Sequence, residues 1–253
     1  MTNSIIAWCH RQIHLWLPNA CLWCSLPVQQ ADAQLCAFCC DNLPRLSLDI
    51  VNHNAIALPA ISRGLQQHRF NQLICLSWYQ QPWQHWISQW KFQQDLACGA
   101  ALLRQFEQAC QQWRTQLQVD AVCYVPMHDR RCRQRGFNQA EQLAAVAAAQ
   151  LQIPLLHIFT VNTAHPHQVG LNRQQRRANL RKKFRLGTNM AIPPRILLVD
   201  DVITTGATVN ALCRLLKKQN VNHIVVATLA VTRAPGTRAE LYPKSLKIRV
   251  GAE

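Results

Sequence analysis

The sequence predicts an α/β protein: a parallel sheet flanked by helices and preceded by a small cysteine-rich module. Three observations carry this prediction. Apolar runs alternate with helical segments along the second half of the chain, the stretch RILLVDDVITTGAT (Arg195–Thr208) ends an apolar run in two acids, and two C-x₂-C pairs lie near the N-terminus. Such alternation is typical of βαβ units whose sheet is covered on both faces.

Hydrophobic periodicity and turn residues place the individual elements. An amphipathic helix is expected at 5–17, ended by Pro18. Further helices are expected at 83–92, 100–117, 138–150 and 207–218, and strands at 74–79, 120–125, 195–199 and 223–231.

Changes in composition divide the chain into four parts. Weak periodicity, polar residues and two prolines mark an irregular connector before the first strand. The predicted parts are the N-terminal helix and cysteine module (1–45), the connector (46–72), the α/β domain (73–235) and a C-terminal tail (236–253).

The charge is strongly positive and unevenly distributed. The 253 residues carry a formal net charge of +15, which favours anionic partners such as nucleic acid or phosphorylated metabolites. No Asp or Glu lies between Gln142 and Val199. The N-terminus lacks a secretory pattern and no run of about 18 apolar residues occurs, so we expect a cytoplasmic protein without a membrane span.

The acid pair Asp200–Asp201 is followed by a turn rich in hydroxyls. Backbone N–H groups and threonines at a helix N-terminus form a cradle for phosphate, whereas two carboxylates suit vicinal hydroxyls or a divalent cation. A sugar phosphate satisfies both halves. The alternative is an ordinary strand-to-helix turn with Thr205 or Thr208 as the N-cap. A Walker P-loop is excluded because no Gly-Lys-Ser/Thr follows.

Val199–Thr208 resembles the signature with which the phosphoribosyltransferase fold binds phosphoribosyl pyrophosphate. The resemblance implies that Asp200 and Asp201 contact the ribose hydroxyls or the accompanying Mg²⁺. It also implies that the 5′-phosphate is held by Thr204, Thr205, Gly206, Ala207 and Thr208.

Two more blocks, VPMHDRRCRQRGFNQAEQLA (Val125–Ala144) and HQVGLNRQQRRANLRKKFRL (His167–Leu186), resemble the ComF/GntX group of competence-associated proteins. The first block falls where phosphoribosyltransferases carry their pyrophosphate loop, and the second where related enzymes have a mobile hood. A solvated turn is the alternative for the first, and a nucleic-acid backbone is an alternative ligand for the second. The residues expected to bind pyrophosphate or another anion are Met127, His128, Arg131, Arg135, Arg176 and Arg177.

The cysteine cluster has the spacing of a metal-binding knuckle. Four thiolates from two C-x₂-C pairs can converge tetrahedrally on Zn²⁺, so one structural zinc is expected at Cys21, Cys24, Cys36 and Cys39. Two alternatives are unliganded cysteines in a small core and Cys40 in place of Cys39. The remaining cysteines lie mostly among apolar neighbours and are expected to pack.

An aromatic stretch carries Trp78, Trp83, Trp86 and Trp90 near basic residues. Interleaved aromatics and cations can stack single-stranded bases, but the helical spacing favours a stripe that faces the core. The adjacent Lys91–Phe92 pair also resembles a feature of the ComF group, with no chemistry assigned to it.

The ComF resemblance implies a role in natural transformation or in the use of imported DNA. The expected function is binding of phosphoribosyl pyrophosphate in support of uptake or use of single-stranded DNA, with that DNA and other competence proteins as partners. Catalytic turnover as a phosphoribosyltransferase is the alternative. No residue was identified that would act as a catalytic base or name the acceptor, so the catalytic residues and the enzyme activity stay open.

Overall fold

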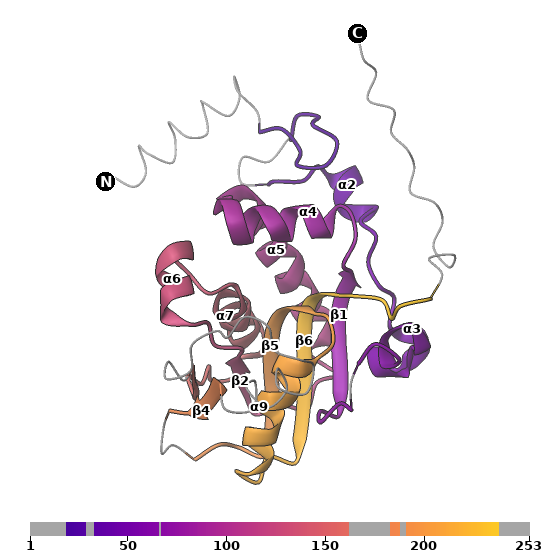
Figure 1. Cartoon of the computed structure of the whole chain (residues 1–253). Coiled ribbons are helices and arrows are strands. Elements are labelled where there is room, and N and C mark those ends of the chain that lie inside the picture. Colours follow the sequence, from indigo (N-terminus) through magenta and orange to yellow (C-terminus); the bar gives the residue numbers. More distant parts are fainter. Residues whose placement is uncertain (1–18, 29–32, 66, 162–182, 188–190, 238–253) are drawn as a thin grey trace.

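A computed structural model describes residues 19–28, 33–65, 67–161, 183–187 and 191–237. Its centre is a four-stranded, all-parallel sheet in the order β1-β6-β5-β2 (Figure 1). The runs of Ile, Leu and Val predicted from the sequence form these strands and lie buried in the core, as expected for a parallel sheet covered on both faces. The strands are β1 (Gln72–Trp78), β2 (Ala121–Tyr124), β5 (Arg195–Ile203) and β6 (His223–Val231).

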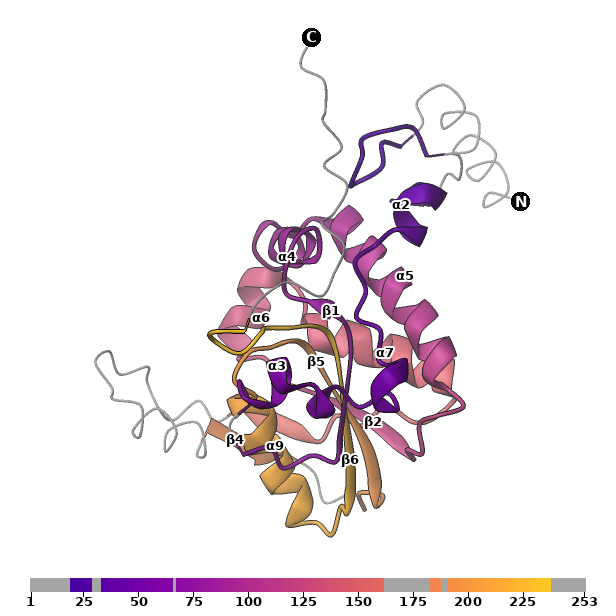
Figure 2. The same cartoon turned by 90° about the vertical axis from the view of Figure 1, so that its right-hand side faces the viewer.

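Helices cover both faces of the sheet. Helix α7 (Gln139–Leu151) packs on β2 and β5, and α5 (Leu96–Trp113) packs on α7. Helix α9 (Ala207–Lys217) lies on the opposite face, as Figures 1 and 2 show together. The Ala-rich sequence of α7 lets it approach the strands closely, since Ala140, Ala144 and Ala147 are buried.

The paths after two neighbouring strands diverge. The chain leaves β2 toward α7 on one face, whereas it leaves the adjacent β5 toward α9 on the other. In open α/β sheets such a divergence at the carboxyl ends of neighbouring strands opens the crevice in which ligands bind. The fold therefore places its candidate ligand site beyond the carboxyl ends of β2 and β5.

In Figure 1 the cysteine-containing segment lies at the top of the domain, and the chain after it runs down beside β1 to the short helix at Pro59–Ser62. The Leu46 backbone N–H donates to the Leu76 carbonyl at 2.7 Å, and Trp83 Nε1 donates to the Pro44 carbonyl at 3.1 Å. Residues 37–62 carry only short elements, which are α2 (Ala37–Asp41), η1 (Asp49–Val51), η2 (Ala55–Ala57) and α3 (Pro59–Ser62).

The structure confirms every strand and helix predicted within its described part. The aromatic segment forms α4 (Trp83–Ser88) followed by the π-helix η3 (Gln89–Gln93), and its tryptophans are buried, so the core-facing stripe is confirmed. Strand β5 extends four residues beyond its predicted end, so the acid pair lies inside the strand. Elements that were not predicted include α6 (Asp129–Arg135) and the hairpin of β3 (Phe159–Val161) and β4 (Phe184–Leu186).

The helix expected at 5–17 and the C-terminal tail from 238 lie outside the described residues. Within the described part, no helix combines the length and the apolar character that crossing a bilayer requires.

Candidate functional site

The acid pair lies in the part of β5 that extends beyond the end of β2. The β2–β5 ladder ends with Tyr124 opposite Val199, and the Val125 N–H makes one more bond, to the Val199 carbonyl, at 2.9 Å. Asp200 is the next residue of β5. The loop that follows β2 therefore leaves the sheet directly beside the two acids. Two segments predicted to bind the ligand, the loop after Val125 and the acid pair, thus lie next to each other.

Hydrogen bonds fix the backbone and part of the carboxylates at the acid pair. The Asp201 N–H donates to Asp200 Oδ1 at 2.9 Å, and the Val202 N–H donates to Asp201 Oδ1 at 2.6 Å. On the β6 side, Thr228 Oγ1 donates to the Asp201 carbonyl at 2.8 Å. Both acids are partly buried, so their orientation is set by the strand rather than by solvent.

A lysine that is distant in sequence completes the local charge balance. Lys91 Nζ lies 2.7 Å from Asp201 Oδ2, and the two side chains are only 16% and 14% exposed. Burial, together with the neighbouring Asp201 charge, raises the pKa of Asp200 to about 8, although the Lys91 ammonium acts in the opposite direction. Asp200 therefore holds a proton near neutral pH, while Asp201 is ion-paired.

The threonine hydroxyls of the turn after β5 do not cap the helix that follows. Gly206, at φ +71°, is the N-cap of α9, and no side chain caps this helix. The alternative in which Thr205 or Thr208 serves as the N-cap is therefore wrong. Thr204 and Thr205 are exposed. The first N–H groups of α9 lack intrahelical partners, which is the arrangement that receives a phosphate at a helix N-terminus.

Asn138 positions the loop after β2. Its Nδ2 donates to the Val125 carbonyl at 3.1 Å while its Oδ1 accepts the Ala140 N–H, so one side chain caps α7 and holds the loop. His128 Nδ1 accepts the Arg130 N–H at 3.1 Å and starts α6. The predicted loop residues Met127 and His128 are partly buried in this segment.

The arginines of the first ComF-like block lie on α6 instead of on a turn. Arg131 is exposed, and the Arg135 guanidinium lies 5.0 Å from the centre of the Phe92 ring. Burial and the nearby Arg131 charge lower the pKa of Lys183, which directly precedes β4. Cations from two segments thus gather beside the loop. Arg176 and Arg177 lie outside the described residues.

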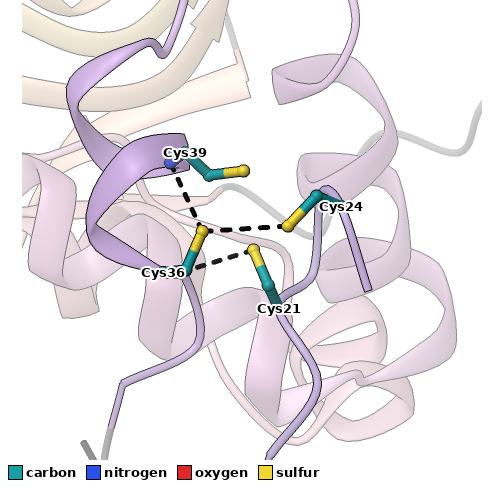
Figure 3. A group of neighbouring side chains, drawn as sticks. All are labelled: Cys21, Cys24, Cys36 and Cys39. Atoms are coloured by element: carbon teal, nitrogen blue, oxygen red, sulfur yellow. Dashed lines mark hydrogen bonds between the residues drawn. The ribbon is translucent and has the colours of Figure 1, made fainter. Parts of the chain in front are cut away.

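The four predicted cysteines converge (Figure 3). Their sulfur atoms all lie within 4.8 Å of one another, and Cys24 Sγ is 3.7 Å from Cys36 Sγ. Tetrahedral Zn–S bonds of about 2.3 Å would place the sulfurs roughly 3.8 Å apart, so the donor set fits a metal of this kind. Backbone N–H groups of Cys36 and Cys39 point at sulfurs of the cluster, as they do around bound thiolates.

Cys39, and not Cys40, joins the cluster. Cys40 Sγ faces the domain, where it accepts a hydrogen bond from Gln105 Nε2 at 3.4 Å. Although burial raises the pKa of Cys21, N–H donors from Cys24, Cys36 and Trp23 lower it to about 7 overall. Burial and the neighbouring sulfurs raise the pKa of Cys39. A bound cation would favour the thiolate form of all four, which is how metal binding and folding are coupled.

Comparison with known proteins identifies the family. The chain is 31% identical over 231 residues to DNA utilization protein YhgH of Salmonella typhimurium, with 86% of this chain and 99% of the relative covered. The chain belongs to the ComF family. A second ComF relative, Competence protein F of Haemophilus influenzae, is 33% identical over 171 residues, which is 65% of this chain and 75% of that protein.

A domain model agrees with the fold. Residues 138–250 match the phosphoribosyl transferase domain, so this ComF chain has a parallel α/β domain of the phosphoribosyltransferase type. Among solved structures, purine phosphoribosyltransferase from Pyrococcus horikoshii is 18% identical with a TM-score of 0.34, covering 51% of this chain and 73% of that chain.

The sequence does not predict the contact between Lys91 and Asp201. The two residues are 110 positions apart, and no local motif links the Lys91–Phe92 pair to the acid pair. The one feature of the sequence that could have indicated this contact is a single lysine inside a tryptophan-rich helix. A lysine in such a helix must either point to solvent or pair with a buried acid, and Lys91 pairs with Asp201.

Proposed function

We propose that the protein binds phosphoribosyl pyrophosphate. Asp200 and Asp201 grip the ribose hydroxyls, and the turn Thr204–Thr208 holds the 5′-phosphate. The observation that carries the proposal is the position of the acid pair on β5, one residue past the end of the β2 ladder and directly before a glycine-capped helix. Carboxylates accept from hydroxyls while a helix N-terminus accepts an anion, so a sugar phosphate matches both halves.

The diphosphate end of the ligand would lie over the loop after β2. Met127, His128, Arg131 and Arg135 border this position, and arginine pairs well with phosphate oxygens. The charge gathered from Lys183 and Arg131 supports an anion here. Mg²⁺ accompanies the diphosphate of the ligand.

The biological role we propose follows from the ComF family. Its relatives are named for competence and for DNA utilization. We infer that this protein acts on the cytoplasmic side in the uptake or use of exogenous single-stranded DNA, with that DNA and other competence proteins as partners. The cysteine cluster holds one structural zinc, and binding of this metal stabilises the fold of the module around it.

The second candidate is an active phosphoribosyltransferase. In that reaction the bond between the ribose anomeric carbon and the pyrophosphate oxygen breaks, a bond to an acceptor nucleophile forms as the acceptor gives up its proton to solvent, and pyrophosphate is released. The cations on α6 support this reading, because they would stabilise the charge that develops on a leaving group bound at the loop after β2. Pyrophosphate release measured across purine, pyrimidine and amine acceptors tests for turnover.

The binding proposal is tested by titration calorimetry with phosphoribosyl pyrophosphate and Mg²⁺. The double variant Asp200→Asn and Asp201→Asn should bind at least about tenfold more weakly, since it removes the charge of Asp201, and a hydrogen bond to a charged group contributes roughly 1.5–3 kcal/mol. Asp120→Asn is the matched control, because Asp120 pairs with Arg195 at the opposite end of β5. Unchanged affinity in the double variant would exclude the proposed ligand site.

The cellular role needs a separate measurement. Cells that lack the protein are complemented with the wild type, the double variant or the Asp120→Asn control, and transformation or growth on DNA is scored. Restoration by the double variant would separate the DNA role from the ligand site. Restoration by the wild type and the control alone supports a role that depends on the ligand.

A further inference from the structure

Lys91 and Asp201 form the most deeply buried ion pair in the described part of the chain. Their side chains are 16% and 14% exposed, whereas every other pair there has a partner at least 45% exposed. A lysine is rarely withdrawn from water to this degree unless it is paired. The 2.7 Å contact between Lys91 Nζ and Asp201 Oδ2 is therefore a built-in structural feature of the site and not an incidental surface ion pair.

The backbone presents Lys91 to the acids in an uncommon conformation. Lys91 is the central residue of the five-residue π-helix η3, which ends at Gln94 in the left-handed region at φ +55°. Short π-helical segments are rare and frequently occur at functional sites. Trp90, the preceding residue, is buried and stacks on Phe137 with ring centres 5.8 Å apart.

The same π-helix also contacts the arginine helix α6. Gln94 Nε2 donates to the Gln134 carbonyl at 3.1 Å, and the Phe92 ring lies under the Arg135 guanidinium. Residues of η3 and its C-cap thus contact α6 through Phe92 and Gln94, while Lys91 contacts Asp201 on β5. This segment therefore connects the two halves of the proposed site.

The oxygens left at the acid pair limit what it can bind. Asp201 Oδ2 faces Lys91, Asp201 Oδ1 accepts the Val202 N–H, and Asp200 Oδ1 accepts the Asp201 N–H. Mg²⁺ requires near-octahedral oxygen ligands at short distance, and an ammonium at one carboxylate repels a second cation there. The donor set does not fit a divalent cation held directly by both acids. It does fit hydroxyl groups, because the ionised carboxylate of Asp201 can accept more than one hydrogen bond per oxygen and the neutral carboxyl of Asp200 can both accept and donate one.

We propose that the Lys91 ammonium takes the place of a divalent cation at the acid pair. It neutralises and orients Asp201, so that the acids bind the ribose hydroxyls directly, with no divalent cation between them. Mg²⁺ then binds only the diphosphate of the ligand. This inference rests on the proposed phosphoribosyl ligand and adds a positioning residue that holds Asp201.

Ribose 5-phosphate is the probe that isolates this end of the site, because it carries no diphosphate. Its affinity is measured by calorimetry in EDTA and in excess Mg²⁺. The wild type should change less than about twofold between the two conditions, whereas Lys91→Gln should bind roughly 10- to 100-fold more weakly in EDTA. Added Mg²⁺ should restore part of that loss, since the cation can enter the space that the ammonium leaves.

Two control variants test whether the effect depends on the charge at position 91. Lys91→Arg keeps the charge and should retain most of the affinity, and Lys218→Gln removes an exposed lysine at the far end of α9 and should match the wild type. If Lys91→Gln fails to fold because Asp201 is left buried and unpaired, the double variant Lys91→Gln with Asp201→Asn removes both charges. That double variant should bind weakly and show no response to Mg²⁺.

The outcomes separate this inference from the function on which it rests. Equal affinity of Lys91→Gln and the wild type in EDTA, or a wild type that binds ribose 5-phosphate only with Mg²⁺, overturns the role of Lys91 and leaves the ligand intact. A strong Mg²⁺ response in the double variant also overturns it. A wild type that binds neither ribose 5-phosphate nor phosphoribosyl pyrophosphate overturns both proposals.

Discussion

Gly99 lies against the indole ring of Trp90. A Cβ atom built at position 99 would come within 2.5 Å of Trp90 Nε1 and 2.7 Å of Cδ1, distances that a real methyl group cannot adopt. Gly99 is the fourth residue of α5, and Trp90 precedes Lys91 in the π-helix. The missing side chain therefore allows the π-helix that carries Trp90 and Lys91 to pack against α5.

Gly99→Ala should destabilise the protein. Alanine in place of glycine inside a helix is normally worth about 0.5–1 kcal/mol of added stability. Here overpacking against a buried indole should reverse the sign and cost about 1–3 kcal/mol of unfolding free energy. Urea unfolding measures the change, and Ala100→Ser, at an exposed position of the same helix, should stay within about 0.5 kcal/mol of wild type. A more stable Gly99→Ala variant would contradict the packing argument.

Cys39→Ser and Cys40→Ser should differ in metal content. The purified protein should carry about one zinc per chain, and Cys39→Ser should lose it because a hydroxyl is a poor substitute for the fourth thiolate. Cys40→Ser should keep its zinc, since Cys40 bonds to Gln105 and lies outside the cluster. Elemental analysis after dialysis decides the matter, and zinc retained by Cys39→Ser but lost by Cys40→Ser would reverse the ligand assignment.

The sheet was predictable because its strands are recognisable as continuous apolar runs in the sequence. The apolar runs of β5 and β6 are too continuous for surface elements, and the predicted bounds of β6 coincide with those observed. Strand β5 was predicted too short because its last residues include Asp200 and Asp201, and acids disfavour strands in isolation. Pairing with β6 supplies the hydrogen bonds that override this preference.

The candidate site was only half predictable, since part of it depends on long-range packing. The acids, threonines and cysteines form local motifs whose spacing carries their chemistry. Helix α6 could not be predicted from periodicity, because its seven residues include four arginines and no buried position. Lys91 lies in a π-helix and contacts an acid 110 positions away, and no local pattern encodes that contact.

Thr205→Val tests whether the turn before α9 serves the ligand or the helix. A side-chain cap contributes about 1 kcal/mol to stability, but Gly206 occupies the cap position here. The unfolding free energy of Thr205→Val should therefore stay within about 0.5 kcal/mol of wild type. Loss of one hydroxyl contact to phosphate should weaken ribose 5-phosphate binding about 5- to 20-fold. A destabilised variant with normal affinity would restore the capping interpretation.

Asp200 should make stability fall as pH rises. Burial and the Asp201 charge raise its pKa to about 8 in the folded protein, whereas an unfolded Asp titrates near 3.9. Between these values the folded state holds a proton that the unfolded state has lost, so this stabilisation is complete below about pH 4 and lost above about pH 8. Asp200→Asn stays neutral at every pH and lacks this dependence.

The pH dependence is measured as the thermal midpoint of wild type and Asp200→Asn from about pH 5 to about pH 9. The difference between the two proteins should grow with pH, in favour of Asp200→Asn, because only the wild type must ionise a buried carboxyl beside Asp201. Asp120→Asn should give no such trend, since the Arg195 partner lowers the pKa of Asp120 and keeps it ionised across this range. Parallel curves for wild type and Asp200→Asn would show that Asp200 is already ionised at neutral pH, with the proton excluded by the Lys91 charge.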